Sequence, residues 1–495
     1  MSSSSSRTSR PSRRRHGAPH RPSARVPSSR DGAEELVLRV GPPAHGGHCV
    51  ARPVDDPAGR VVFVRHSLPG ETVRAVLTER SARIWRADAI DVLSPSPDRV
   101  RPAWPEAGPG GVGGGELSHV ALPAQRTWKR WVLADCLRRI GGEEVAEAVA
   151  RLPEATGAGA VPVEAMPGEA VAESSDDPRV RRRAGTGTRT RIALTVTDDG
   201  LAGMHGFRSG RVLPVSSLPL ADPAIRDLGL TERSAWRRRY RPGMRVRAVA
   251  PSAGEPVVLL SDEEGSRVLT AAGRPTGRRR VEEVIDATGL GLGELRYSVH
   301  AEGFWQVHRE AGAVLMDRVV RAALSEAPTA AGTRADDLPL DPGALAGTRV
   351  VELYAGAGLF TLPLAALTGT VRSLEGEGRA VRDARRTLHA REGARLLTGR
   401  VTAAGVAELG RFTSGAPGAD AVVLDPPRQG AGREVVEAVA ALGAPRVVMA
   451  ACDPAAGARD LGLFMRTGYR IAAMSALDMF PHTHHFETVC VLERE

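Results

Sequence analysis

A cysteine follows an apolar run that is predicted to form a buried strand. The run PRVVMAA leads directly into Cys452, and Asp453 and Pro454 come next. At the carboxyl end of a sheet strand, a cysteine can act as a nucleophile through its thiolate. The alternative is an inert thiol packed in a core, since cysteine is among the residues most often buried. Position alone leaves both interpretations open.

Two carboxylates could work with that thiol. Asp425 ends the apolar run AVVL, and Pro426 and Pro427 then fix the backbone in a rigid turn. We expect Asp425, followed by this turn and Arg428, to meet both a cofactor and a substrate. Glu487 lies near the C-terminus in the segment FPHTHHFET and could accept a proton as a general base.

A glycine-rich turn precedes these residues in the chain. In VVELYAGAGLFTLPLA a predicted buried strand ends at Glu352, and Gly356 and Gly358 then make a tight turn into a helix. Small residues at such a turn let the backbone approach a nucleoside closely, and a carboxylate about 20 residues later can accept ribose hydroxyls. Glu375 ends the next predicted strand at about that distance. The alternatives are a turn used only for packing and an ordinary solvated glutamate.

All these residues follow short apolar runs that alternate with helical patterns. The runs are VVELYAG, VRSLE, AVVLD, PRVVMAAC and ETVCVLE, and segments such as GRAVRDARRTLHA lie between them. That alternation is typical of a doubly wound α/β domain, which binds ligands at the carboxyl ends of its strands. We predict this domain over residues 301–495, with a linker of low hydrophobicity at 325–347.

Two other regions precede that domain. Residues 34–96 contain short β-branched segments separated by Gly and Pro, which predicts a small β-barrel. Residues 97–300 mix strand-like pieces with arginine clusters and predict a mixed α+β region. Within it, residues 125–140 carry apolar side chains at helical spacing, including Trp131 and Ile140. We expect this helix to pack on the α/β domain.

Two arginine-rich stretches in the central region could contact RNA. They span residues 179–191 and 233–247, and the second also contains Trp236 and Tyr240. Guanidinium groups can meet phosphates, while aromatic rings can stack on unpaired bases. The alternative for each stretch is an ordinary solvated surface, and the sequence does not choose between the two.

The positive charge of the chain is concentrated at its N-terminus. Residues 1–33 are rich in Ser, Arg and Pro and lack the apolar segment of a secretory signal, so we expect a disordered basic tail. Eight of its residues are arginines, out of a formal net charge of +9. Any RNA contact elsewhere must therefore come from local clusters. No apolar run approaches the ~18 residues that span a bilayer, which excludes a membrane protein.

The cysteines and histidines give no sign of a metal site. Four cysteines lie far apart and none belongs to a CxxC pair, so neither a disulfide framework nor a four-thiolate site is supported. The three histidines of FPHTHHFET are not completed by a further ligand pattern, and we expect no metal. The cysteine usage favours a reducing cytoplasm.

With these motifs assembled, the chain resembles the RNA (uracil-C5)-methyltransferase family with an N-terminal TRAM domain. The resemblance covers nearly everything after the tail, including GGHCVAR, GFWQV, ELYAGAGLF, LDPPRQG, ACDP and FPHTHHFETV. The last three motifs are highly specific in this order and spacing. The resemblance implies a Rossmann-like class I methyltransferase domain, an OB-like TRAM barrel and a central RNA-binding domain.

The resemblance also implies a substrate, a cofactor and roles. The substrate would be a uridine of 23S rRNA or tRNA, flipped out of its stack, and the cofactor would be S-adenosyl-L-methionine. Cys452 would add to uracil C6, which makes C5 nucleophilic, and Glu487 would later remove the C5 proton. The cofactor site would comprise Gln306, Tyr354, Gly356, Gly358, Glu375 and Asp425. Phe304 and Arg428 would contact the substrate. We expect a monomer.

The chain departs from the family pattern at several positions. Many members hold an iron–sulfur cluster on four cysteines, and the matching positions here are Trp104, Val112, Gly115 and Leu218. No thiolate remains there, so we expect no iron–sulfur cluster. Three changes near the expected cofactor site are Leu359 and His308, each in place of an Asn, and Arg400 in place of an acid.

Two other functions are compatible with parts of this sequence. An amino-group nucleic-acid methyltransferase could use the DPPR tetrad, because other methyltransferases place a similar tetrad there, but it would not need Cys452. A non-catalytic RNA-binding or folding factor on the same scaffold would explain the altered cofactor positions. Such a factor would not need both Cys452 and Glu487.

Overall fold

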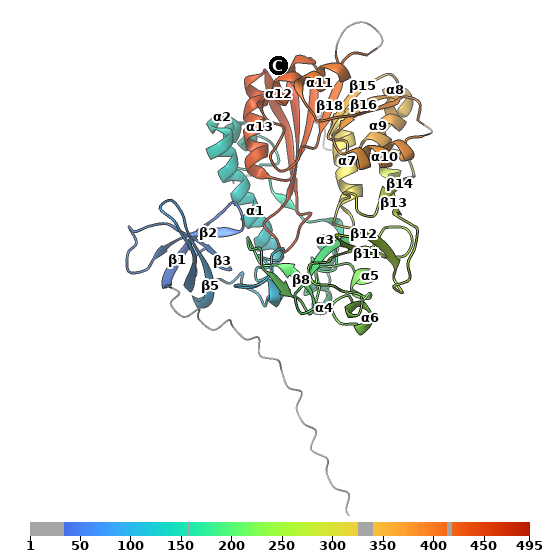
Figure 1. The fold of residues 1–495 in the computed structure, drawn as a ribbon. Helices are drawn as coiled ribbons and strands as arrows, with labels where there is room; N and C mark the ends of the chain where they lie inside the picture. The colour runs from blue at the N-terminus through green and yellow to red at the C-terminus, as the bar shows by residue number, and fades with distance from the viewer. Residues whose placement is uncertain (1–33, 156–158, 325–339, 390, 413–417) are drawn as a thin grey trace, which may run out of the picture.

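The computed structural model describes residues 34–155, 159–324, 340–389, 391–412 and 418–495. The predicted tail and most of the predicted linker lie outside these ranges. The described residues form an N-terminal barrel, a central region of antiparallel strands, and an α/β part whose large sheet stands at the top of Figure 1. Among them no helix is long and apolar enough to cross a membrane.

Five strands close into the N-terminal barrel, in the order β1-β2-β3-β5-β4. They are β1 Glu35–Ala44, β2 His48–Pro53, β3 Val62–Arg65, β4 Thr72–Arg80 and β5 Trp85–Ser94. Side chains point alternately into and out of the barrel, so that Leu38 and Val40 are buried and Arg39 between them is exposed. The β-barrel that the sequence predicts is therefore confirmed.

The central region contains a six-stranded sheet, in the order β12-β11-β10-β7-β8-β9, and the separate pair β13-β14. The strands are β7 Arg191–Val196, β8 Ala202–His205, β9 Val212–Pro214, β10 Arg245–Val249, β11 Val257–Asp262, β12 Gly265–Thr270, β13 Arg280–Asp286 and β14 Glu294–His300. The helices are η1 Pro105–Ala107, α3 Pro167–Glu173, α4 Pro178–Arg181, α5 Pro223–Arg226, α6 Ser234–Arg237 and η3 Thr288–Leu290. The pair β13-β14 packs on helix α10 (Gly378–Thr387) of the α/β part.

The aromatic side chains of the second arginine-rich stretch are not available for stacking. Trp236 and Tyr240 are buried in the core of the central region. The Trp236 indole donates to the carbonyl of Leu228 at 2.8 Å, and the Tyr240 hydroxyl donates to that of Leu230 at 2.9 Å. Stacking of these rings on RNA bases, one of the two interpretations that the sequence left open, is therefore ruled out, because the rings hold the fold beneath an exposed run of arginines.

A helix covers the range predicted from periodicity. Helix α1 spans Leu122–Cys136, continues as the π-helical turn η2 Leu137–Gly141, and is followed by α2 Glu143–Ala150. Its buried face shares a core with helix α13 (Pro454–Arg466) of the α/β part. Trp131 and Ile140 are exceptions to the apolar pattern, since both are nearly half exposed.

The α/β part is one eight-stranded sheet, in the order β17-β16-β15-β18-β19-β21-β20-β6. Its strands are β6 Val163–Glu164, β15 Arg349–Leu353, β16 Thr370–Glu375, β17 Ala394–Thr398, β18 Ala421–Leu424, β19 Arg446–Ala451, β20 Tyr469–Leu477 and β21 Glu487–Arg494. The remaining helices are α7 Ala311–Leu324, α8 Pro342–Leu345, α9 Thr361–Thr368, α11 Ala403–Leu409 and α12 Arg433–Ala441. The predicted α/β architecture is confirmed, and β6 joins it from the central region.

The order of this sheet reverses beside strand β15. That strand pairs in parallel with β16 on one side and with β18 on the other, and β18 pairs in parallel with β19. In open α/β sheets the crevice outside the carboxyl ends of the strands at such a reversal is where ligands bind. All four strands end at this edge. The sheet therefore brings the residues that follow each of them into one region.

Candidate active site

Cys452 directly follows β19 and is half-buried. Strand β21 runs antiparallel beside β19, and Thr488 lies opposite Ala451 and donates its hydroxyl to the Ala451 carbonyl at 3.1 Å. This pairing places Glu487, the first residue of β21, next to the thiol. The carboxylate of Asp453 caps helix α13 by accepting the amides of the second and third residues after it, at 3.0 and 2.9 Å. Cys452 is thus fixed between a strand and a helix.

The electrostatics around Cys452 favour the neutral thiol. Burial, followed by the carboxylates of Glu487 and Asp425, raises the pKa of Cys452 to about 12, while Arg428 acts in the opposite direction. Only the thiolate is a strong nucleophile. A positively charged ligand beside these carboxylates would stabilise the thiolate, because it would offset both negative neighbours.

One oxygen of the Glu487 carboxyl lacks a hydrogen-bond partner among the described residues. The side chain is buried, and the Oε1 atom has no hydrogen-bond partner among the described residues. Burial and the neighbouring Asp425 raise the pKa of Glu487 well above its usual range. Buried polar atoms in native proteins are almost always satisfied. This oxygen is therefore available to a ligand or substrate.

Glu375 ends β16 and Asp425 directly follows β18, so both lie at the carboxyl edge of the sheet, on either side of β15. Glu375 accepts the backbone amide of Gly356 at 2.8 Å and that of Glu377 at 2.6 Å, which holds its carboxylate against the glycine-rich turn. Burial and the charge of Glu375 raise the pKa of Asp425. Each carboxylate oxygen of Glu375 keeps a second lone pair, so the ribose contact predicted for it remains possible.

The glycine-rich turn leaves open space above the sheet. Tyr354 has a φ of 64°, which is uncommon outside glycine, and Gly356 and Gly358 have φ values of 57° and 88°. A Cβ atom added to Gly356 would meet no heavy atom within 4 Å. A nucleoside can therefore approach this backbone, and the partly buried carboxylates of Glu375 and Asp425 suit a nucleoside that carries a positive charge. The chain fits S-adenosyl-L-methionine in both respects.

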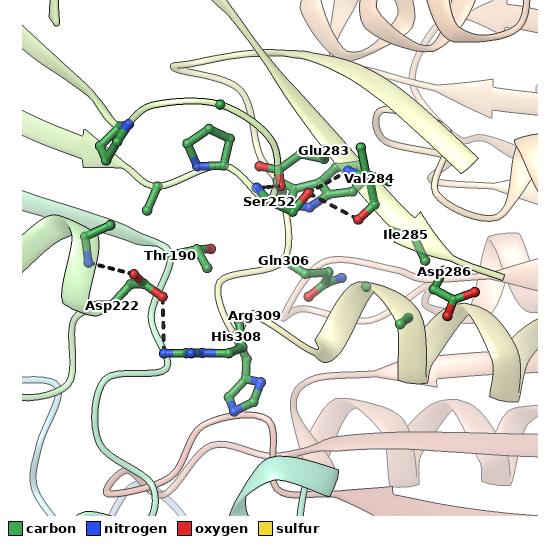
Figure 2. A pocket seen from close by; sticks show the side chains of 18 residues that line it. Thr190, Asp222, Ser252, Glu283, Val284, Ile285, Asp286, Gln306, His308 and Arg309 are labelled. Atoms are coloured by element: carbon green, nitrogen blue, oxygen red, sulfur yellow. Dashed lines mark hydrogen bonds and ion pairs between the residues drawn. The ribbon is translucent and has the colours of Figure 1, made fainter. Parts of the chain in front are cut away.

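Gln306 lines a separate cavity of about 220 Å³ next to helix α7 (Figure 2). Arg309 pairs there with Asp222 at 3.1 Å, and Ser252 donates its amide to Glu283 at 3.0 Å. The lining contains none of the residues that follow β15, β16, β18 or β19. Cys452, the predicted nucleophile, does not line the cavity that Gln306 lines. The contact between Gln306 and the cofactor remains a prediction.

The two residues predicted to contact the substrate differ in their surroundings. The Phe304 ring is 72% exposed, in the loop between β14 and α7. Arg428 is also exposed, and its Nη2 lies 3.3 Å from Nε2 of His485. Burial and the charges of His484 and Arg428 lower the pKa of His485 to about 3, so the ring is neutral and accepts a hydrogen bond from Arg428.

Sequence reasoning missed two side chains that approach this site from distant parts of the chain. His45, in the turn between β1 and β2, lies 3.1 Å from the carboxylate of Asp453. Glu116, which follows the barrel, accepts the backbone amide of His484 at 3.2 Å. No local pattern signals either contact, since more than 360 residues separate the partners of each pair.

Two groups of histidines and carboxylates come together in the fold, although the sequence shows no ligand pattern for either. Glu116, His484 and His485 lie close enough to share an ion, and so do Glu169, His308 and Glu310. In each group the rings already have hydrogen-bonding partners. His484 pairs with Glu116, and His308 lies 3.3 Å from Glu169. The expectation of no metal remains a prediction.

The other departures from the family pattern also have defined positions. The Leu359 side chain is buried in a core, and its carbonyl accepts the hydroxyl of Tyr297 at 3.1 Å. Arg400 is exposed at the end of β17. His308 is buried, lies 3.3 Å from Glu169 and lines the same cavity as Gln306. Each replacement is thus accommodated by the fold around it.

The four positions that match cluster cysteines of the family do not suit an iron–sulfur cluster. Trp104 and Val112 are buried in one apolar core, and Leu218 packs against it. A Cβ atom on Gly115 would lie 2.8 Å from the Trp104 ring, so the indole occupies the space that a side chain there would need. The four cysteines of the chain lie elsewhere, in β2, at the end of α1, after β19 and in β21.

Comparison with known proteins identifies the family. Residues 344–495 match the family described as tRNA (Uracil-5-)-methyltransferase. An RNA methyltransferase of Streptomyces avermitilis is 38% identical over 481 residues, which cover 93% of this chain and 98% of that protein. The 23S rRNA (uracil(1939)-C(5))-methyltransferase of Alkalilimnicola ehrlichii is 31% identical over 451 residues, or 88% of this chain and 92% of that protein.

A solved structure shares the fold. The tRNA (uracil-54, C5)-methyltransferase of Pyrococcus abyssi, in complex with S-adenosyl-L-homocysteine, aligns with a TM-score of 0.54. The alignment covers 92% of this chain and 99% of the other, at 19% sequence identity. The same family is indicated by the sheet order, by the residues at the carboxyl edge of the sheet and by the relatives. The chain belongs to the RNA (uracil-C5)-methyltransferase family, whose members are transferases that use S-adenosyl-L-methionine.

Proposed function

We propose that this protein methylates C5 of a specific uridine in 23S rRNA or tRNA, the two RNAs named for its relatives. One observation carries the mechanism. The thiol of Cys452 lies beside the buried and partly unpartnered carboxyl of Glu487, on the adjacent antiparallel strand. A nucleophile and a general base so close together serve a reaction that forms and then eliminates a covalent adduct.

The proposed reaction uses each of these groups in turn. The Cys452 thiolate adds to uracil C6, and the π electrons move to give enolate character at C5. S-adenosyl-L-methionine supplies the methyl group. Glu487 then takes the proton from C5, the C5–C6 double bond reforms, and the C6–S bond breaks to release the Cys452 thiolate.

The raised pKa values of the free protein fit this sequence of events. Glu487 must be ionised to accept the proton, and Cys452 must be ionised to attack. Burial and mutual repulsion oppose both ionisations in the free protein. A positive charge bound beside Asp425 offsets the repulsion, so the site becomes reactive only when it is loaded.

The remaining parts of the chain are assigned by the same proposal. The barrel acts as a TRAM domain that binds RNA together with the central region, and the exposed ring of Phe304 stacks near the extruded uridine. The enzyme works in the cytoplasm as a monomer. It carries no iron–sulfur cluster, since three of the corresponding positions are apolar and the Trp104 ring fills the space beside the fourth, Gly115.

The decisive experiment uses RNA that contains 5-fluorouridine. Fluorine cannot leave C5 as a proton, so the adduct between RNA and Cys452 accumulates and survives denaturation. On a denaturing gel we expect a band of this protein–RNA adduct with S-adenosyl-L-methionine and either 23S rRNA or tRNA. The band should disappear in Cys452→Ala and persist in Cys136→Ala, which changes a buried cysteine on α1.

Two outcomes would overturn this proposal. Failure to trap an adduct with either RNA would contradict a covalent mechanism on these substrates. A Cys452→Ala variant that still transfers methyl groups would instead indicate an amino-group methyltransferase that acts through the DPPR tetrad. Mapping RNA modifications in a deletion strain would then identify the nucleotide.

A further inference from the structure

The loop over residues 104–119 connects the barrel to helix α1 and packs into the core of the central region. Trp104 is almost fully buried, and the core around it also contains Ala107 and Val112. A Cβ atom on Gly115 would lie 2.8 Å from both the Trp104 ring and the Ala107 methyl group. Since real Cβ atoms do not approach so closely, only glycine lets the loop close on the indole.

A carboxylate ties this loop to the central region. Oε1 of Glu106 accepts the amide and hydroxyl of Ser216 at 2.7 and 2.9 Å, and Oε2 accepts those of Ser217 at 3.2 and 3.0 Å. The Trp104 indole also donates to Oε2 at 3.2 Å. Burial alone would raise the pKa of Glu106, but these hydrogen bonds outweigh it and lower the pKa. These hydrogen bonds fix the loop to Ser216 and Ser217.

The far end of the loop holds the segment that precedes Glu487. Leu117 donates its amide to the carbonyl of His482 at 3.0 Å. Glu116 is buried and accepts the amide of His484 at 3.2 Å, and it also pairs with Nδ1 of the same ring. Both contacts of Glu116 converge on one residue. With Leu117 and with Gln125, which accepts the His482 amide at 2.7 Å, they hold the backbone turn before β21.

That turn sets the position of the groups around the nucleophile. The rings of His484 and His485 lie 3.9 Å apart at their centroids, and His485 contacts Arg428. Two residues after His485, the chain reaches Glu487, whose Oε1 atom is free to meet a substrate. A displacement at His484 would therefore move both Arg428 and Glu487 relative to Cys452.

We propose that Glu116 is a positioning residue for the catalytic base Glu487, and that Trp104 and Glu106 form a metal-free brace that holds Glu116 in place. Trp104 stands at a position where many members of the family carry a cluster cysteine, and its ring lies against Gly115, which is another such position. This inference rests on the proposed function, because it assigns Glu487 as the base. It goes further in giving a role in the reaction to a residue far from the sheet.

The test separates base positioning from nucleophilic attack. In Glu116→Ala, turnover on unmodified RNA should fall roughly 10- to 100-fold, with little change in KM, because a small displacement of a catalytic group has effects of this size. The covalent RNA adduct should then accumulate on ordinary uridine, as it should in Glu487→Gln. Trapping by 5-fluorouridine should fall much less than turnover does, since that adduct forms before the base acts. Glu116→Gln should restore most of the turnover, because its amide oxygen can still accept from His484.

The controls make each failure distinct. Glu437→Ala changes an exposed glutamate on α12 and should behave as wild type, and thermal unfolding should show that Glu116→Ala remains folded. Wild-type turnover in Glu116→Ala, or an equal loss of trapping and turnover, would overturn the positioning role. Stoichiometric iron and sulfide in protein expressed with both would overturn the metal-free brace. Absence of any adduct in the wild type would instead contradict the proposed function.

Discussion

At the scale of single residues, the site contains acidic groups that disfavour one another's ionisation. Cys452, Asp425 and Glu487 are each harder to ionise than in water, because burial and the neighbouring carboxyl groups disfavour further negative charge. Arg428 is the cation that acts on the thiol. Under the proposed mechanism, a positive charge bound beside these carboxylates would make the thiol easier to ionise.

This view predicts how Cys452 reacts in the absence of ligands. Alkylation of Cys452 by iodoacetamide should accelerate about tenfold per pH unit between about pH 7 and pH 10, because the thiolate fraction rises in that proportion below the pKa. Mass spectrometry of the Cys452 peptide measures the rate. The other cysteines, Cys49, Cys136 and Cys490, are buried and provide slow internal references. A plateau below about pH 9 would show that the thiol is already activated.

At the scale of elements, the glycine-rich turn after β15 can be tested against a matched position. Gly356 and Gly369 have φ values of 57° and 71°, and a Cβ atom on either one meets nothing within 4 Å. Alanine at either position should lower the free energy of unfolding by about 1 to 2 kcal/mol, from backbone strain. Only Gly356→Ala should also weaken binding of S-adenosyl-L-methionine, by about tenfold or more, because its methyl group enters the space above the turn. Calorimetric titration of both variants measures this, and equal affinities would place the cofactor elsewhere.

The same strand carries a buried acid that should make stability depend on pH. Glu352 accepts the hydroxyls of Thr361 and Ser373 at 2.5 and 2.6 Å, and burial raises its pKa to about 7. The folded state then binds a proton that the unfolded state has released, between the unfolded pKa of about 4.3 and about pH 7. Stability should therefore decrease as the pH rises through this window and level off above it.

Glu352→Gln should remove that dependence, since the amide does not ionise. At about pH 8 we expect the variant to be more stable than the wild type by about 1 to 3 kcal/mol, while the two should converge near pH 5. Urea unfolding between pH 5 and pH 8 measures the difference. Parallel stability curves for the two proteins would show that Glu352 is ionised throughout.

At the scale of the whole molecule, the enzyme joins an almost neutral body to a basic N-terminal segment. Residues 1–30 contain eight arginines and no acid, against a formal net charge of +9 for the chain, which leaves +1 for the rest. Deleting residues 1–33 should make RNA binding less dependent on salt, by up to about 0.7 to 0.9 in the log–log slope for each arginine that contacts phosphate. Binding isotherms at several salt concentrations measure the slope. Adduct formation at saturating RNA should not change, and an unchanged slope would show that these arginines make no phosphate contact.

Much of this molecule follows from local pattern. Short apolar runs alternating with amphipathic helices specify a parallel sheet with covered faces, and residues after such strands must meet at one edge. Cys452, Asp425 and Glu375 could therefore be brought together from the sequence alone, and the sheet order confirms their common edge. The tight turn at Gly356 and Gly358 could also be predicted from the sequence, because positive φ values favour a residue without a side chain.

Other features were decided only by the tertiary structure, because they depend on contacts between distant segments. Trp236 and Tyr240 look like RNA-stacking rings beside arginines, yet the surrounding core buries both. Glu116 has no motif of its own and gains its role only where the loop after the barrel meets His484. Packing and long-range hydrogen bonds leave no periodic trace in the chain. The sequence thus determined the chemistry and the sheet that carries it, while the fold decided which distant side chains hold that chemistry in place.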